Sequence, residues 1–107
     1  MASSKEYLYF ILDQLSGLND VSYRQMMGEY IIYYRGKIVG GIYDDRFLVK
    51  QTPSAKRLMP NAALEIPYEN AKAMILVDNV DEREFLCELF EAMEKELPVQ
   101  KTKKKPC

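Results

Sequence analysis

The chain has 107 residues, of which 48% are hydrophobic and 29% charged, and its formal net charge is −1. This length and composition are typical of one folded, water-soluble domain with its own hydrophobic core. No apolar run approaches the roughly 18 residues of a membrane span, and the N-terminal stretch MASSKEYLYF lacks the pattern of a signal peptide, so we expect a cytoplasmic protein.

Charge is unevenly distributed along the chain. Four of the 15 basic residues lie close to the C-terminus, which leaves 11 basic against 16 acidic residues, a net of −5, for the rest: the four are Lys101, Lys103, Lys104 and Lys105. We interpret residues 1–98 as a domain and residues 99–107 as a disordered, lysine-rich tail. Because duplex DNA selects basic surfaces, an acidic body argues against specific DNA binding.

The first predicted element is an amphipathic helix. Ser3 and Glu6 form a capping box that satisfies backbone N–H groups at its start. Gly17 is placed to end it in the left-handed conformation, which glycine adopts without steric cost. Between these ends, apolar residues recur at helical spacing: Leu8, Ile11, Leu12 and Leu15.

The hydrophobic period then changes to the alternation typical of strands, in segments rich in tyrosine and β-branched residues. Two short turns, residues 35–36 and 44–45, divide this stretch, because Gly and Asp tolerate the backbone angles of tight hairpins. Gly40 and Gly41 predict a bulge or a close approach by a neighbouring side chain. The pattern therefore predicts an antiparallel meander with strands at residues 22–27, 29–34, 37–43 and 46–50.

A short helix and a further strand follow the meander. Thr52 precedes a proline and is expected to cap the helix, which ends near Met59 because another proline follows. Residues 62–68 fit no single element. Residues 73–77 alternate as a last strand.

The closing helix has the strongest pattern. Asp81 and Glu84 form a second capping box, and Pro98 is expected to stop the helix. One face is apolar, through Leu86, Leu89, Phe90, Met93 and Leu97. The predicted fold class is therefore α+β: a helix, an antiparallel sheet interrupted by a short helix, and a closing helix.

The second meander strand has apolar side chains on both faces, with Tyr30, Ile32 and Tyr34 on one and Ile31 and Tyr33 on the other. The two long helices can cover one face. A second copy of the chain is the simplest cover for the other, which predicts a homodimer. The alternative is that tyrosine hydroxyls and the loop at residues 59–68 suffice.

Residues suited to catalysis or to metal binding are scarce. The chain has no histidine and only two cysteines, Cys87 and Cys107, so we expect no catalytic residue, no metal and no cofactor. Asp44 and Asp45 resemble a carboxylate pair with Glu29, but adjacent aspartates at a hairpin tip are far more often turn formers. Two arginines, Arg24 and Arg46, are suited to an anion or to ion pairs with those same acids.

Residues 24–50 contain the spaced pattern R-x-M-x-G-E-Y-x-x-Y-Y-x-G-K-x-x-G-x-x-x-D-D-R-x-x-x-K. This pattern resembles the N-terminal domain of the TfoX/Sxy family, here as a single domain, over about residues 5–97. The resemblance implies an α+β fold arranged like that of secretion chaperones, and it supplies no catalytic residue. It also implies a role near that of the competence regulators of the family, which act with a cyclic-AMP receptor protein at promoters for DNA uptake.

We therefore expect a non-enzymatic protein-interaction module that regulates gene expression and whose partner is a protein such as a transcription factor. The candidate interaction surface consists of Arg24, Glu29, Ile31, Tyr33, Asp44, Asp45 and Arg46. One alternative is weak nucleic-acid binding through the lysine-rich tail together with exposed tyrosines. Another is a small-molecule-binding or enzymatic domain.

Overall fold

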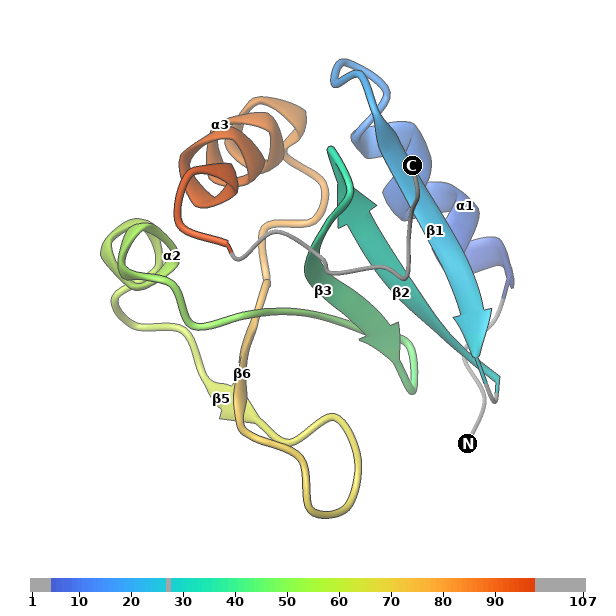
Figure 1. Cartoon of the computed structure of the whole chain (residues 1–107), viewed down its shortest axis with the longest axis vertical. Helices are drawn as coiled ribbons and strands as arrows, with labels where there is room; N and C mark the ends of the chain where they lie inside the picture. The colour runs from blue at the N-terminus through green and yellow to red at the C-terminus, as the bar shows by residue number, and fades with distance from the viewer. Residues whose placement is uncertain (1–4, 27, 98–107) are drawn as a thin grey trace, which may run out of the picture.

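Three helices and six strands form the described part of the chain, which is residues 5–26 and 28–97 of a computed structural model (Figure 1). In chain order they are α1 (Lys5–Gln14), β1 (Val21–Met26), β2 (Glu29–Tyr34), β3 (Lys37–Tyr43), β4 (Arg46–Val49), α2 (Pro53–Leu58), β5 (Leu64–Glu65), β6 (Met74–Leu76) and α3 (Arg83–Glu94). This order confirms the predicted α+β class.

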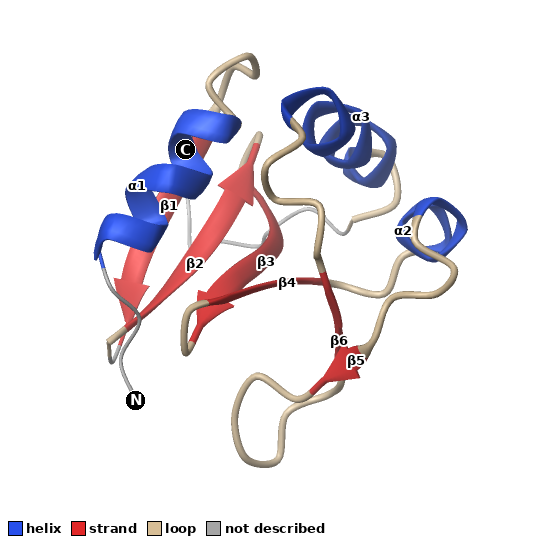
Figure 2. Cartoon of the chain, turned by 180° about the vertical axis from the view of Figure 1, so that it is seen from behind, coloured by secondary structure: helices blue, strands red, loops and turns tan. Residues whose placement is uncertain are grey.

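All six strands pair antiparallel in one sheet, in the order β1-β2-β3-β4-β6-β5. The first four strands are the predicted meander. The chain then passes through α2 and returns, so that β6 pairs with β4 and carries β5 at its outer edge. Figure 2 shows α1 in front of β1 and β2 on the left of the view, and α3 and α2 on the right, beyond β3.

The alternation along β2 decides which face the helices cover. Its buried side chains are Tyr30, Ile32 and Tyr34. Ile31 and Tyr33, which point the other way, are only half-buried. The ring of Phe90 in α3 lies 5.9 Å from that of Tyr34 between centroids, and both belong to the single core cluster that includes the apolar stripe of α1. The helices therefore pack on one face only, as expected.

Both hairpin turns have the left-handed backbone that the sequence predicted. The φ angles are 54° and 79° at Arg35 and Gly36, and 55° and 57° at Asp44 and Asp45. Positive φ at both central residues gives a turn whose twist matches that of the paired strands. These turns fix the register of the meander.

The two glycines inside β3 lie where backbones approach closely. The β2–β3 register slips by one residue at Val39, so a bulge lies directly before the two glycines at which the sequence predicted a bulge or a close approach. A Cβ on Gly40 would overlap the backbone oxygen of Leu48 in β4, and a Cβ on Gly41 would stand 2.8 Å from the Tyr43 ring. Glycine is therefore required at both positions.

The end of α1 differs from the prediction. Gly17 does not adopt the left-handed conformation; the helix ends at Gln14 and its last turn tightens, with the N–H of Leu18 bonded to the oxygen of Leu15 at 3.0 Å. The positive φ, of 65°, falls on Asp20 instead. Tight turns of this kind satisfy the last carbonyl groups without a glycine cap.

The start of α3 also differs, because Asp81 does not cap it. Glu82 takes the N-cap position and makes no side-chain cap hydrogen bond. Asp81 lies instead inside a turn closed by the N–H of Glu82 and the oxygen of Asn79, 3.1 Å apart. The predicted apolar face of α3 is confirmed as buried. The predicted roles of Ser3, Met27 and Pro98 fall outside the described residues.

Candidate functional site

The register of the sheet brings five residues of the predicted interaction surface to the face opposite the helices: Arg24, Glu29, Ile31, Tyr33 and Arg46. Arg24 is the pairing partner of Ile31, and Arg46 that of Tyr43. Because side chains alternate along a strand, the odd-numbered residues of β2 share this face. Residues 44–45 stand apart, at the tip of the β3–β4 hairpin.

The loop between β5 and β6 covers the part of this face formed by β3, β4 and β6. The rings of Tyr43 and Tyr68 lie 6.0 Å apart between centroids, and Nε2 of Gln51 donates to the oxygen of Ala73 at 2.9 Å. Leu48 is fully buried here, although it points away from the helices. The sequence offered cover by residues 59–68 as the alternative to a second copy of the chain; the loop that covers this part of the face begins later, after Glu65.

The part of the face formed by β1 and β2 is exposed on β1 and half-buried on β2 among the described residues, and we call it the open surface. It consists of Ser22, Arg24, Met26, Glu29, Ile31 and Tyr33. Met26 is 44% exposed. Because β1 pairs with β2 alone among the described strands, one row of its backbone N–H and C=O groups faces outward. Apolar area beside a cation and an open strand edge suits another polypeptide.

The acidic residues of the predicted surface have structural roles. The carboxylate of Glu29 accepts a hydrogen bond from the backbone N–H of Asp44 at 3.1 Å, so it steadies the hairpin tip. Asp44 and Asp45 are turn formers, as the sequence favoured. The described geometry thus gives Glu29, Asp44 and Asp45 a part in the hairpin.

Arg46 was expected to bind an anion or to pair with these acids, and its partner is another residue. Its guanidinium forms an ion pair with Glu65 of β5 and donates through Nε to the oxygen of Tyr43 at 3.1 Å. The sequence could not indicate this pair, because β5 lay in the ambiguous segment. Arg24, by contrast, is exposed on the open surface.

A groove of about 540 Å³ lies between the sheet and the β5–β6 loop, beside the open surface. Its lining includes Ile31, Ile38, Tyr43, Met74, Lys50 and Lys72. Sequence reasoning missed this groove, because the two lysines stand 22 positions apart in the chain. The pairing of β6 with β4 brings them to the same place.

The Tyr43 hydroxyl is held in its protonated form. Burial raises its pKa above the ordinary value, and the nearby Tyr68, Glu29 and Tyr33 raise it further. Removing the proton would leave a phenolate in a poorly solvated place beside an acid. Tyr43 therefore presents an O–H donor at neutral pH.

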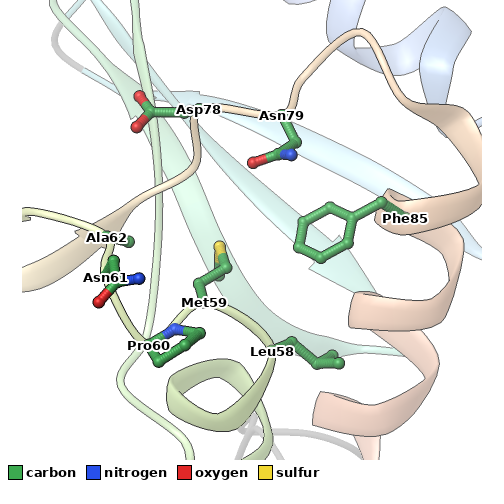
Figure 3. Close-up of a pocket in the computed structure, with 8 residues that line it drawn as sticks. All are labelled: Leu58, Met59, Pro60, Asn61, Ala62, Asp78, Asn79 and Phe85. Atoms are coloured by element: carbon green, nitrogen blue, oxygen red, sulfur yellow. The ribbon is translucent and has the colours of Figure 1, made fainter.

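A second hollow, of about 240 Å³, lies where the end of α2 meets the start of α3 (Figure 3). Leu58, Met59 and Phe85 give it apolar walls, and Asp78 and Asn79 also line it. Over residues 5–26 and 28–97, no three His, Cys, Asp or Glu side chains are grouped to hold a metal ion. This hollow has the character of a packing gap between two helices.

None of the helices in the described residues is long and apolar enough to cross a membrane.

Comparison with protein families matches residues 13–85 of the chain to the TfoX N-terminal domain. A protein of Spirochaeta aurantia, named as an uncharacterized 12.7 kDa protein in the trpE 5′ region, is 34% identical over 82 residues, which cover 77% of this chain and 71% of that protein. No solved structure matches the chain significantly.

Proposed function

Because this chain belongs to the TfoX N-terminal domain family, we propose that it is a non-catalytic protein-interaction module that acts in the regulation of gene expression. The family is associated with competence for DNA transformation and is not a known enzyme family. Both facts support the proposal. The matched region, residues 13–85, includes the whole sheet and the start of α3.

The observation that carries the proposal is the open surface. Ile31 and Tyr33 are half-buried although they belong to a central hairpin of the sheet, and Met26 beside them is 44% exposed. The helices and the β5–β6 loop cover the central strands, whereas Tyr23 and Gln25 of β1 are exposed on the face that the helices cover elsewhere. An exposed strand edge next to apolar side chains offers both main-chain hydrogen bonds and contact area to a partner.

The partner we propose is a protein, such as a transcription factor. The charge of Arg24 and the apolar area of Ile31 and Tyr33 favour a surface with a carboxylate and apolar side chains. Arginine and tyrosine are also the residue types on which interface energy tends to concentrate. A second copy of the chain is one partner of this kind, and it would make the protein a homodimer with a twofold axis on the open surface.

Transcript levels in the native cell test the regulatory role. A strain without the protein should show altered expression of a defined gene set, including genes for DNA uptake. Wild type should restore expression, whereas Arg24→Glu/Tyr33→Glu should not, because both changes place a negative charge on the open surface.

The matched control is Lys56→Glu/Tyr9→Glu, which changes charge equally on exposed helical positions. Thermal unfolding first establishes that both variants are folded. Unchanged transcripts in the deletion strain would contradict the regulatory role. Full restoration by the open-surface variant would contradict the role of the surface.

A further inference from the structure

The groove has an apolar floor and a cationic border. Ile31 and Ile38 come from neighbouring strands of the meander, and Tyr43 lies beside them. Met74 lines the groove from β6. Among residues 5–26 and 28–97, the charged residues in its lining are two lysines, Lys50 and Lys72.

The positive charge of the groove is opposite in sign to the net charge of the chain outside its lysine-rich tail. Outside its lysine-rich tail the chain has a net charge of −5, yet the described residues that line the groove include no Asp or Glu. The hydroxyl of Tyr43, which is protonated at neutral pH, adds a donor to the lining. Gln51 already donates through Nε2 to the loop at Ala73. The polar groups that line the groove thus favour an anion, and its floor favours an apolar group.

We propose that the groove binds a short acidic segment of a partner protein, with a carboxylate placed between the two lysines and an adjacent aromatic or aliphatic side chain on the floor. This inference rests on the proposed function and specifies the chemistry of the partner. Removal of apolar area from water supplies the attraction. The lysine charges select carboxylates and reject basic segments, which is how complementary charge gives specificity.

A protein segment fits the groove better than a free small carboxylate does. Small-molecule sites bury about 70–90% of the ligand surface, whereas this groove is partly open to solvent. The groove also shares Ile31 with the open surface. A partner that lies on the open surface can therefore extend a segment into the groove without a break in contact.

Titration of the isotope-labelled protein with a blocked synthetic peptide, acetyl-Glu-Phe-Glu-Leu-amide, followed by NMR, tests the proposal. Shifts should concentrate at Lys50, Gln51, Ile38 and residues 71–74. Acetyl-Lys-Phe-Lys-Leu-amide should give no such shifts. The double variant Lys50→Glu/Lys72→Glu should weaken binding of the acidic peptide by about ten-fold or more, a change equivalent to about 1.4 kcal/mol.

The control is Lys5→Glu/Lys56→Glu, which changes net charge equally at exposed positions outside the groove and should bind as wild type does. If the charge-reversal variant unfolds, the milder Lys50→Gln/Lys72→Gln is measured instead. Equal weakening in both double variants, or shifts spread beyond the groove, would overturn the proposal. Binding of phenylacetate at least as tight as that of the peptide would overturn the assignment to a protein segment.

The proposed function can fail or survive independently of this result. Regulation that depends on the open surface, together with absent peptide binding, would remove the groove inference alone. Peptide binding without any change in transcripts would leave the groove as a binding site and would contradict the regulatory role.

Discussion

The ring of Tyr43 lies across the backbone of Gly41, so that a Cβ at position 41 would stand 2.8 Å from Cε2 of the ring. The same Cβ would stand 2.6 Å from the carbonyl oxygen of Tyr30 on the neighbouring strand. Tyr43 in turn contacts Tyr68 in the β5–β6 loop. The absence of a side chain at position 41 therefore positions the ring that the loop packs against.

Gly41→Ala should lower the free energy of unfolding by about 3 kcal/mol, because one of the two atoms it meets belongs to the backbone and cannot move aside. Gly36→Ala is the control: its φ is 79° and a Cβ there meets nothing within 4 Å, so only backbone strain of about 1 kcal/mol is expected. Urea unfolding measures both. Equal losses for the two variants would mean that the contact with Tyr43 is unimportant.

The carboxylate of Glu96 should make stability depend on acid pH. It accepts hydrogen bonds from the hydroxyl and the backbone N–H of Ser54, at 2.6 and 2.9 Å, and these bonds hold its pKa below the ordinary value of 4.5. A lowered folded-state pKa contributes stability above the unfolded value, and that contribution is lost as the pH falls through the folded value.

Glu96→Gln should therefore reduce stability at pH 7 and flatten its decline in acid. The exposed Glu91→Gln in α3, the helix that ends just before Glu96, is the control, and it should follow wild type. Thermal unfolding between about pH 7 and pH 3 gives the comparison. A parallel decline for Glu96→Gln and wild type would show that this carboxylate has no part in the acid response.

The meander was predictable because its determinants are local. Both turns and all four strands follow from short-range patterns, and the alternation in β2 identified the two faces. The caps were less predictable: Asp81 has the residue type of a cap, but the turn at Asn79 takes its place. The capping-box pattern is defined only by residue types and their spacing. The observed start of α3 depends instead on the path of the chain after β6.

The covered half of the sheet was not predictable from local patterns. The Arg46–Glu65 pair and the groove between Lys50 and Lys72 depend on where β6 and its loop return to the sheet. The pairing of β6 with β4 joins segments that are far apart in the sequence, and no periodic pattern in residues 59–73 predicts it. Of the predicted surface, Arg24, Glu29, Ile31 and Tyr33 lie on the open surface, while Asp44, Asp45 and Arg46 lie at or beside the β3–β4 hairpin.

DNA binding should be weak and confined to the lysine-rich tail. The rest of the chain has a net charge of −5, and repulsion from phosphates opposes stable contact. Deletion of residues 101–107 should abolish any binding to a labelled duplex at about 0.15 M salt, measured by fluorescence anisotropy. Tight binding by the shortened protein would contradict the inference that the negative charge of the rest of the chain prevents DNA binding.

Self-association should use the open surface, if a second copy is the partner. Sedimentation equilibrium over a wide concentration range should show a mass that rises toward twice 12.5 kDa. Ile31→Glu and Tyr33→Glu should each keep the protein monomeric, because each buries a charge at the twofold contact. A mass of 12.5 kDa at every concentration would exclude the homodimer and leave the surface to another protein.

The most direct test of the open surface as a protein-interaction site is quantitative affinity capture from the native cell, with mass spectrometry of the recovered proteins. Wild type is compared with Arg24→Glu/Tyr33→Glu and with the charge-matched control Lys56→Glu/Tyr9→Glu. We predict at least one protein that wild type and control recover equally and that the open-surface variant recovers about ten-fold less. Equal recovery of every captured protein by all three would contradict the account.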